Sequence, residues 1–323
     1  MRMKAVVRHH YGAPEILELT DVDTPVPGDG EVLVQVRAAS LNPYDWHMVR
    51  GEPYVIRLMA GLRAPKDHGV GIDVAGIVHA VGSGVTDLAV GDEVFGLGDA
   101  TLAEFAVSKA IRLARKPERV SFESAAAVPC AGVTALQALG DKGSLVAGQR
   151  VLINGAAGGV GTFAVQIARS MDASVTGVCS TRNMGFVRDL GADDVIDYTA
   201  DDFSRGAHRY DLILDAVGNR NLAELRRVLA PQGTLVLCGA PKGRWVRPFS
   251  LLAGAAVRSR FARQRLVSFM ASVTTSELDA LAASMQDGAL APVIEGTCEL
   301  ADSGEALARV EEGHVRGKVV IRV

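Results

Sequence analysis

The sequence predicts an α/β protein in which a β-rich domain is combined with a doubly wound parallel sheet. Its 323 residues exceed one ordinary domain of about 150 residues, so two domains are expected. In the first 125 residues, short β-rich runs are separated by Gly/Pro turns, which favours a small barrel or sandwich. From Arg150 onward, strands and helices alternate, as in a parallel sheet covered on both faces. We expect one domain over 1–125 and 265–323, and the other over 126–264.

Composition excludes several classes of protein. Hydrophobic residues make up 48 % and charged residues 22 %, which excludes a disordered chain and a disulfide-stapled miniprotein. The net charge of −3 advertises no nucleic-acid partner. The longest uncharged run, Val151–Ala168, contains four Gly and is better explained by a buried strand–turn–helix than by a membrane span. Four widely spaced Cys and no signal-peptide pattern lead us to expect a cytoplasmic protein with reduced thiols.

The β-rich domain is expected to begin with five short strands, because turn signals separate five runs of strand-forming residues. These runs are Lys4–Val7, Val32–Val36, Val74–Val81, Glu93–Phe95 and Glu104–Val107. Near the C-terminus, Glu277–Met285 has a helical pattern. Two further strands, Pro292–Ile294 and Val319–Val323, are expected to return to this domain.

The second domain is introduced by Ser121, which can cap an Ala-rich helix that Pro129 interrupts. The strands expected after it are Val151–Asn154, Ser174–Val178, Val195–Asp197, Leu212–Leu214 and Thr234–Leu237. The helices between them are expected at Phe163–Ser170, Met184–Leu190 and Leu222–Leu229. Arg258–Arg265 holds four Arg, which we interpret as a solvated helix face, with a nucleic-acid or membrane patch as the alternative.

The strongest motif is the glycine-rich turn in Val151–Gly161. An apolar strand leads into the turn and a helix leaves it, which is the context that a dinucleotide needs. Glycine lets the backbone approach a pyrophosphate, and the helix start offers unpaired N–H groups. The predicted cofactor-binding residues here are Gly155, Ala157, Gly158, Gly159, Val160 and Gly161.

The turn after the next strand favours NADPH over NADH. An NAD site usually places Asp or Glu there to accept a hydrogen bond from the ribose, but Cys179 holds that place. Ser180 offers a hydroxyl donor and Arg182 a permanent cation, both suited to a 2′-phosphate.

At this point the sequence resembles the medium-chain dehydrogenase/reductase superfamily, and specifically its zinc-free quinone oxidoreductase branch. The resemblance covers almost the whole chain. Its markers are Lys4-Ala-Val-Val, Gly30-Glu-Val-Leu-Val, Ala39-Ser-Leu-Asn-Pro, Gly71-Ile-Asp-Val-Ala-Gly, Gly91-Asp-Glu-Val-Phe, Ala131-Gly-Val-Thr-Ala and Gly155-Ala-Ala-Gly-Gly-Val-Gly. The resemblance implies a chaperonin-10-like (GroES-like) β-barrel catalytic domain, completed by the C-terminal strands, and a Rossmann domain.

The resemblance also implies further cofactor contacts. Thr134 would lie beside the nicotinamide, Tyr198 would help to hold the 2′-phosphate, and Lys318 is a weaker candidate for a phosphate contact. Val217, Cys238 and Gly239 would approach the same cofactor. Members of the family often form dimers, so a homodimer is expected.

No metal is expected. Zinc members of the superfamily use Cys, then a Gly-His-Glu segment, then Cys or Asp, and catalytic zinc needs about three protein ligands. Here Asn42 holds the first ligand position and Ile72 replaces the imidazole. Only Cys130 survives at a ligand-like position, and we interpret it as a buried thiol, either in the core or lining the cleft.

The candidate catalytic residues lie in Ser40–Tyr54. Asn42 can donate to a carbonyl or to the nicotinamide ribose, Asp45 and His47 match family positions that line the cleft, and Tyr54 can shape the pocket. The prediction is a zinc-independent, NADPH-dependent oxidoreductase that transfers hydride to a small molecule, either a quinone or an α,β-unsaturated carbonyl. The alternatives are an enoyl-thioester reductase of the same superfamily and a non-catalytic NADPH-binding protein.

Overall fold

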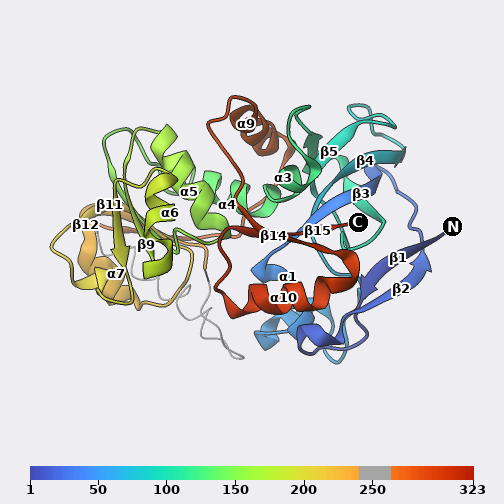
Figure 1. Ribbon diagram of the computed structural model, residues 1–323, viewed down its shortest axis with the longest axis horizontal. Helices are drawn as coiled ribbons and strands as arrows, with labels where there is room; N and C mark the ends of the chain where they lie inside the picture. The colour runs from blue at the N-terminus through green and yellow to red at the C-terminus, as the bar shows by residue number, and fades with distance from the viewer. Residues whose placement is uncertain (240–262) are drawn as a thin grey trace. The chain divides into compact units, whose positions relative to one another are not determined.

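The computed structural model describes residues 1–239 and 263–323, which divide into two compact units (Figure 1). The β-rich unit comprises Met1–Val133 and Val273–Val323, and the Rossmann unit comprises Thr134–Ser272. Both boundaries fall later than the sequence suggests. Residues 126–133 belong to the β-rich unit, where the backbone N–H of Cys130 donates to Asp73. Residues 265–268 belong to the Rossmann unit, because they form a strand of its sheet.

Within the described residues, the β-rich unit contains a two-stranded and a seven-stranded sheet. The smaller sheet pairs β1 (Arg2–Val7) with β2 (Glu18–Asp23) in antiparallel register. The larger has the order β14-β15-β3-β4-β5-β7, with β6 paired to β3. Its strands are β3 (Glu31–Leu41), β4 (Asp73–Val81), β5 (Glu93–Leu97), β6 (Phe105–Lys109), β7 (Leu113–Arg115), β14 (Ile294–Glu299) and β15 (Lys318–Arg322). The C-terminal strand β15 therefore lies between β14 and β3.

The expected strand at Pro292–Ile294 is wrong in its bounds, because β14 begins only at Ile294 and continues to Glu299. The helices of this part of the chain are α1 (Pro43–Arg50), α2 (Arg57–Ala60), α3 (Phe122–Ala126), α4 (Pro129–Leu139), α9 (Thr275–Gln286) and α10 (Ser303–Glu312). Of these, α4 crosses the boundary between the units.

Helix α1 presents the candidate catalytic segment, and its ends follow from its sequence. Asn42 is the N-cap and Pro43 the first helical residue, where a missing N–H costs nothing. Asp45, at the third helical position, accepts from the backbone N–H of Asn42 at 2.7 Å. Gly51 ends the helix in the left-handed conformation, with φ of 60°.

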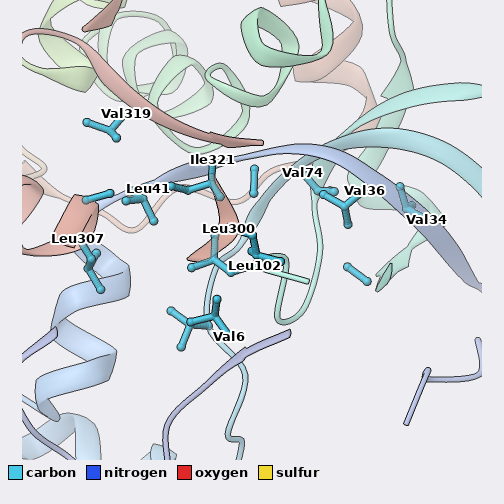
Figure 2. Close-up of a cluster of buried hydrophobic side chains, with 14 of the residues drawn as sticks. Val6, Val34, Val36, Leu41, Val74, Leu102, Leu300, Leu307, Val319 and Ile321 are labelled. Atoms are coloured by element: carbon cyan, nitrogen blue, oxygen red, sulfur yellow. The ribbon is translucent and has the colours of Figure 1, made fainter. Parts of the chain in front are cut away.

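The main core of the β-rich unit is built from aliphatic side chains on one face of its large sheet. Figure 2 shows side chains of β3 and β4 meeting those of the C-terminal strand, with Leu300 and Leu307 beside them. Val34, Val74, Val319 and Ile321 are fully buried. Because fully burying such a side chain contributes about 1.5–3 kcal/mol, β15 is an integral part of this core.

The Rossmann unit contains a parallel sheet with the order β10-β9-β8-β11-β12-β13 among its described strands. These strands are β8 (Arg150–Asn154), β9 (Ser174–Cys179), β10 (Asp194–Asp197), β11 (Tyr210–Asp215), β12 (Leu229–Leu237) and β13 (Arg265–Ser268). The helices between them are α5 (Gly159–Ser170), α6 (Met184–Asp189) and α7 (Leu222–Val228). Chain order reverses between β8 and β11, and ligands bind at the carboxyl ends of strands at such a point.

Strand β12 and Arg265 differ from what the sequence suggests. Strand β12 begins at Leu229 and runs through Pro231 and Gly233, where the sequence suggested a break before Thr234. Of the Arg258–Arg265 run, residues 258–262 lie outside the described residues, and Arg265 opens β13. In the described part of the chain, no helix is long and apolar enough to span a membrane.

Candidate active site and cofactor site

The glycine-rich turn has the geometry that a pyrophosphate needs. Strand β8 ends at Asn154, and Gly155 turns the chain with φ of 89°, a conformation that favours glycine. Helix α5 then begins behind Gly158, an N-cap without a side-chain hydrogen bond, so the first N–H groups of the helix have no such cap. A Cβ at Gly161 would lie 2.0 Å from the carbonyl oxygen of Gly155, so only glycine lets α5 pack this closely. These residues fit a dinucleotide.

A polar network joins the ends of β8 and β11 beside this turn. The Asn154 amide donates to Asp215 Oδ1 at 2.8 Å and to Asn219 Oδ1 at 3.0 Å. The same Asp215 oxygen accepts from the backbone N–H groups of Val217 and Gly218. Asp215 Oδ2 is buried and has no hydrogen-bond partner among the described residues. The network joins the carboxyl ends of β8 and β11 at the switch point.

Val217, Cys238 and Gly239, which the sequence assigns to the cofactor, gather around Asp215. The N–H groups of Cys238 and Gly239 both donate to its carbonyl oxygen at 3.1 Å. Burial raises the pKa of the Cys238 thiol to about 12, so this thiol is neutral and unsuited to act as a nucleophile. A contact between Cys238 and the cofactor stays a prediction.

An acidic residue that sequence reasoning missed lies beside the turn after β9, at the end of β10. Asp197 lies opposite Cys179 in the parallel register of β10 and β9. Its carboxylate accepts from Thr181 Oγ1 at 2.5 Å and from the hydroxyl and N–H of Thr199, and the Thr181 bond is the largest cause lowering its pKa. The sequence search followed the chain after Cys179, whereas strand pairing brings this acid from the next strand. The missing acid is therefore a weaker argument for NADPH than it was in the sequence.

The other predicted residues of this turn are accessible. Arg182 and Tyr198 are exposed and Ser180 is half-buried, while the backbone N–H of Tyr198 donates to the Cys179 carbonyl at 3.0 Å. Thr134 lies in α4. The contacts of these residues with a cofactor stay predictions.

In the β-rich unit, a buried network of polar groups surrounds Asp73. Lys318 is 3 % exposed and Asp73 is fully buried, and their ion pair measures 3.2 Å. Asp73 Oδ2 also accepts from Ser40 Oγ at 2.7 Å and from the Asn42 amide at 2.8 Å. Its Oδ1 accepts from the N–H of Cys130 at 2.9 Å. The charge of Asp73 is thus neutralised and hydrogen-bonded on both oxygens.

The ammonium group of Lys318 is fully engaged in this network. Its ammonium donates to the Leu41 carbonyl at 2.9 Å, to Asn42 Oδ1 and to Asp73, so all three donors have protein acceptors. A phosphate contact by Lys318 stays a prediction, and it would require the ammonium to leave these partners. Asn42, held by Lys318 at one end of its amide and by Asp73 at the other, has a fixed orientation.

The two titratable candidates of α1 have different surroundings. Asp45 is 1 % exposed, and burial raises the pKa of its carboxyl to about 7. His47 stacks on Trp46 with ring centroids 3.6 Å apart, and its Nδ1 lies 2.7 Å from the Glu52 carbonyl oxygen. Because a carbonyl oxygen only accepts, Nδ1 carries a proton and Nε2 is the basic nitrogen of the neutral ring. The Asp45 carboxyl therefore keeps its proton up to about neutral pH, and His47 offers Nε2 as a basic nitrogen.

Tyr54 lies in a separate stack. Its ring packs against the Arg57 guanidinium at 4.7 Å, and Tyr11 packs against the same guanidinium at 4.5 Å. The structure thus brings Asn42 and Asp45 together and assigns Tyr54 to an aromatic–cation stack.

Comparison with known proteins identifies the family to which this chain belongs. The family described as an alcohol dehydrogenase GroES-like domain matches residues 28–118, and the family described as a zinc-binding dehydrogenase matches residues 190–321. The chain is 31 % identical to the chloroplast envelope quinone oxidoreductase homolog of Arabidopsis thaliana, covering 99 % of this chain and 98 % of that protein. It is 35 % identical to the human NAD(P)H oxidoreductase RTN4IP1, mitochondrial, covering 99 % and 89 %. The structure of the quinone oxidoreductase from Coxiella burnetii is similar with a TM-score of 0.86, 30 % identity and full coverage of both chains.

A GroES-like domain joined to a Rossmann domain with a dinucleotide turn defines an oxidoreductase that uses a nicotinamide cofactor. The chain belongs to the medium-chain dehydrogenase/reductase superfamily, in its zinc-free, quinone oxidoreductase-like branch. The resemblance and the fold class predicted from the sequence are both confirmed.

The residues do not fit the zinc that one family description implies. Asn42 and Ile72 stand at two ligand positions, and the neighbouring Asp73 is engaged on both oxygens. Across residues 1–239 and 263–323, no group of three or more His, Cys, Asp or Glu residues could hold a metal ion. The described residues of this site therefore do not form a zinc site.

We expect the purified protein to carry no stoichiometric zinc and to keep its activity in a chelator. The physical reason is that catalytic zinc needs about three protein ligands, and this site offers at most the Cys130 thiol. Elemental analysis and activity before and after EDTA treatment test this. One zinc per chain, lost together with activity, would overturn the assignment.

Proposed function

We propose that this protein is an NADPH-dependent reductase of quinones or α,β-unsaturated carbonyl compounds that works without zinc. The observation that carries the proposal is the Lys318–Asp73–Asn42 network. It includes Asn42 and the neighbour of Ile72, the two residues that stand where the resemblance places zinc ligands. Without a metal Lewis acid, oxidation of a simple alcohol lacks stabilisation for its alkoxide. A conjugated acceptor has no such need.

In the proposed reaction, negative charge develops on the carbonyl oxygen of the acceptor. When bound, a reduced nicotinamide would supply hydride to the β-carbon of a conjugated acceptor. Negative charge would then move to the carbonyl oxygen, and a proton would complete the reduction. Hydrogen-bond donors stabilise that oxygen. The fixed Asn42 orients this part of the site, and its neighbour Asp45 holds a proton up to about neutral pH. His47, through Nε2, is the second group that can hold or deliver a proton.

The proposal is tested by following NADPH consumption with a panel of acceptors. Ortho-quinones and conjugated enones should be reduced much faster than any saturated primary alcohol is oxidised. Faster turnover of an enoyl-CoA would favour the enoyl-thioester reductase instead. NADPH binding without turnover of any acceptor would favour the non-catalytic alternative. We further propose a cytoplasmic homodimer, which fractionation and sedimentation can test.

Replacing Arg182 by Ala should weaken NADPH binding while leaving NADH binding nearly unchanged. Arg182 is exposed in the turn after β9, and a hydrogen bond to a charged group contributes about 1.5–3 kcal/mol. NADPH should therefore bind about ten- to a hundredfold more weakly. Calorimetry with both cofactors gives the dissociation constants, and Arg227→Ala, at an exposed Arg of α7 in the same unit, is the matched control.

Higher salt should also erode the NADPH preference, because an exposed Arg–phosphate pair is screened. Equal losses for both cofactors would mean that Arg182 only supports the turn. A preference for NADH in the wild type would point to Asp197 as the acceptor for the ribose hydroxyls.

A further inference from the structure

A buried arginine in the β-rich unit has polar atoms without partners. Arg8 follows β1, and both of its backbone polar groups bind His68. The Arg8 N–H donates to the His68 carbonyl at 2.9 Å, and the Arg8 carbonyl accepts from His68 Nδ1 at 2.8 Å. The residue is 3 % exposed. Its Nε and Nη1 are buried and make no hydrogen bond within the described part of the chain.

The surroundings of Arg8 do not compensate its charge. Burial lowers the pKa of the guanidinium from its ordinary value, and four acidic groups oppose that change, namely Tyr11, Tyr44, Asp45 and Asp67. None of them forms an ion pair with Arg8 among the described residues. Asp67 is exposed to water, and Asp45 keeps its proton up to about pH 7. Residues 1–239 and 263–323 therefore leave the cation without a full counter-charge.

A buried, unpaired charge is costly, and proteins rarely keep one without use. Desolvation costs several kcal/mol per ion, whereas a partner with good geometry offsets it. A neutral carbonyl group would satisfy one N–H but leave the charge, so an anion fits better. The planar guanidinium matches a carboxylate with two parallel hydrogen bonds. Tyr44, from the same group, is 44 % exposed, so the group reaches the protein surface.

We propose that Arg8 is a specificity-determining residue that binds the carboxylate of an acidic acceptor. The substrate class is then a conjugated carbonyl compound that carries a carboxylate. This inference rests on the proposed reductase function for the chemistry of the acceptor, but the carboxylate site itself can be tested without turnover.

The kinetic test uses a matched pair of acceptors, trans-3-benzoylacrylate and its methyl ester. Arg8→Gln should lower kcat/KM for the acid by about ten- to a hundredfold, mainly through KM, and leave the ester nearly unchanged. Arg8→Lys should retain part of the preference, since it keeps the charge. Arg37→Gln, at an exposed Arg of the same unit, should change neither acceptor. Equal losses for acid and ester in Arg8→Gln would overturn the inference.

The binding test uses the saturated analogue, 3-benzoylpropionate, and its methyl ester with the NADP⁺-loaded protein in a calorimeter. The wild type should bind the acid more tightly than the ester, and Arg8→Gln should lose that difference. If the wild type binds acid and ester equally, or inorganic phosphate more tightly than the acid, the inference is wrong. If the difference is present while neither unsaturated acceptor is reduced, the proposed function fails and the carboxylate site stands.

A stability measurement separates this role from a structural one. Arg8→Met removes a charge that has no partner, so its melting temperature should equal or exceed that of the wild type. A clearly lower melting temperature, together with equal losses for acid and ester, would assign Arg8 to the packing of the β-rich unit.

Discussion

Replacing Lys318 by Met should destabilise the β-rich unit by about 3–5 kcal/mol, the usual cost of removing one partner from a buried ion pair. The Asp73 carboxylate would then be fully buried without its cation, and the Leu41 carbonyl and Asn42 Oδ1 would lose their donor. Because methionine has a similar volume, little of the loss would come from a cavity. The double variant Lys318→Met/Asp73→Asn should recover much of the loss.

Lys116 provides a matched control for this experiment. It is also a buried lysine in the same unit, but its partner Glu93 has a side chain that is 46 % exposed. Lys116→Met leaves that carboxylate in contact with water, so its cost should be much smaller. Urea denaturation followed by tryptophan fluorescence is the measurement. The chain has two Trp, so a Trp245→Phe background makes Trp46, in the β-rich unit, the reporter. Equal costs for the two lysines would contradict the network.

The free energy of unfolding of the β-rich unit should decrease as the pH is raised from 4 to 7, because Asp45 is buried. Burial raises the pKa of this carboxyl from an ordinary 3.8 to about 7. In the unfolded chain the proton is lost near pH 4, whereas the folded chain keeps it to about pH 7. Folding is therefore opposed increasingly as pH rises through this window, and the effect levels off above it. A shift of about three units corresponds to at most about 4 kcal/mol.

Asp45→Asn is the variant that isolates this effect. The Asn side chain cannot ionise, and its oxygen can still accept from the N–H of Asn42, so the helix cap is retained. The free energy of unfolding is measured at pH 5 and pH 8 for both proteins. The wild type should lose more stability than Asp45→Asn over this interval. Parallel losses would mean that Asp45 is already ionised at pH 5 in the folded protein.

Much of the fold was predictable because its signals are local. The turn Gly155–Gly161 follows an apolar strand and opens a helix, and each of these features is visible within a few residues. Strand β12 was partly missed, because it begins at Leu229, although its pairing with β11 is irregular between Leu229 and Thr234, where Pro231 and Gly233 stand. Strand β13 was not predicted, and its residues were placed in the β-rich domain, because only their pairing with β12 shows where they belong.

The site was predictable only in part, because its contacts join distant residues. The cap that links Asn42 to Asp45 is local, and both residues could be named. Asp197 reaches the turn after Cys179 through strand pairing, and Lys318 reaches Asp73 across 245 residues. Arg8 carries no motif, and its signal is that two of its side-chain nitrogens have no hydrogen-bond partner among the described residues.

The position of β15 has a consequence for how the protein is made on the ribosome. Leu41 and Lys318, which are hydrogen-bonded in the native state, lie 277 residues apart, so the β-rich unit cannot complete its sheet until β15 has been synthesised. The Rossmann unit is continuous in sequence and is free to fold earlier. Until β15 arrives, residues 38–41 at the edge of β3 are unpaired and Asp73 lacks its cation. During translation, the nascent β-rich unit is therefore the part of this protein most in need of chaperone protection.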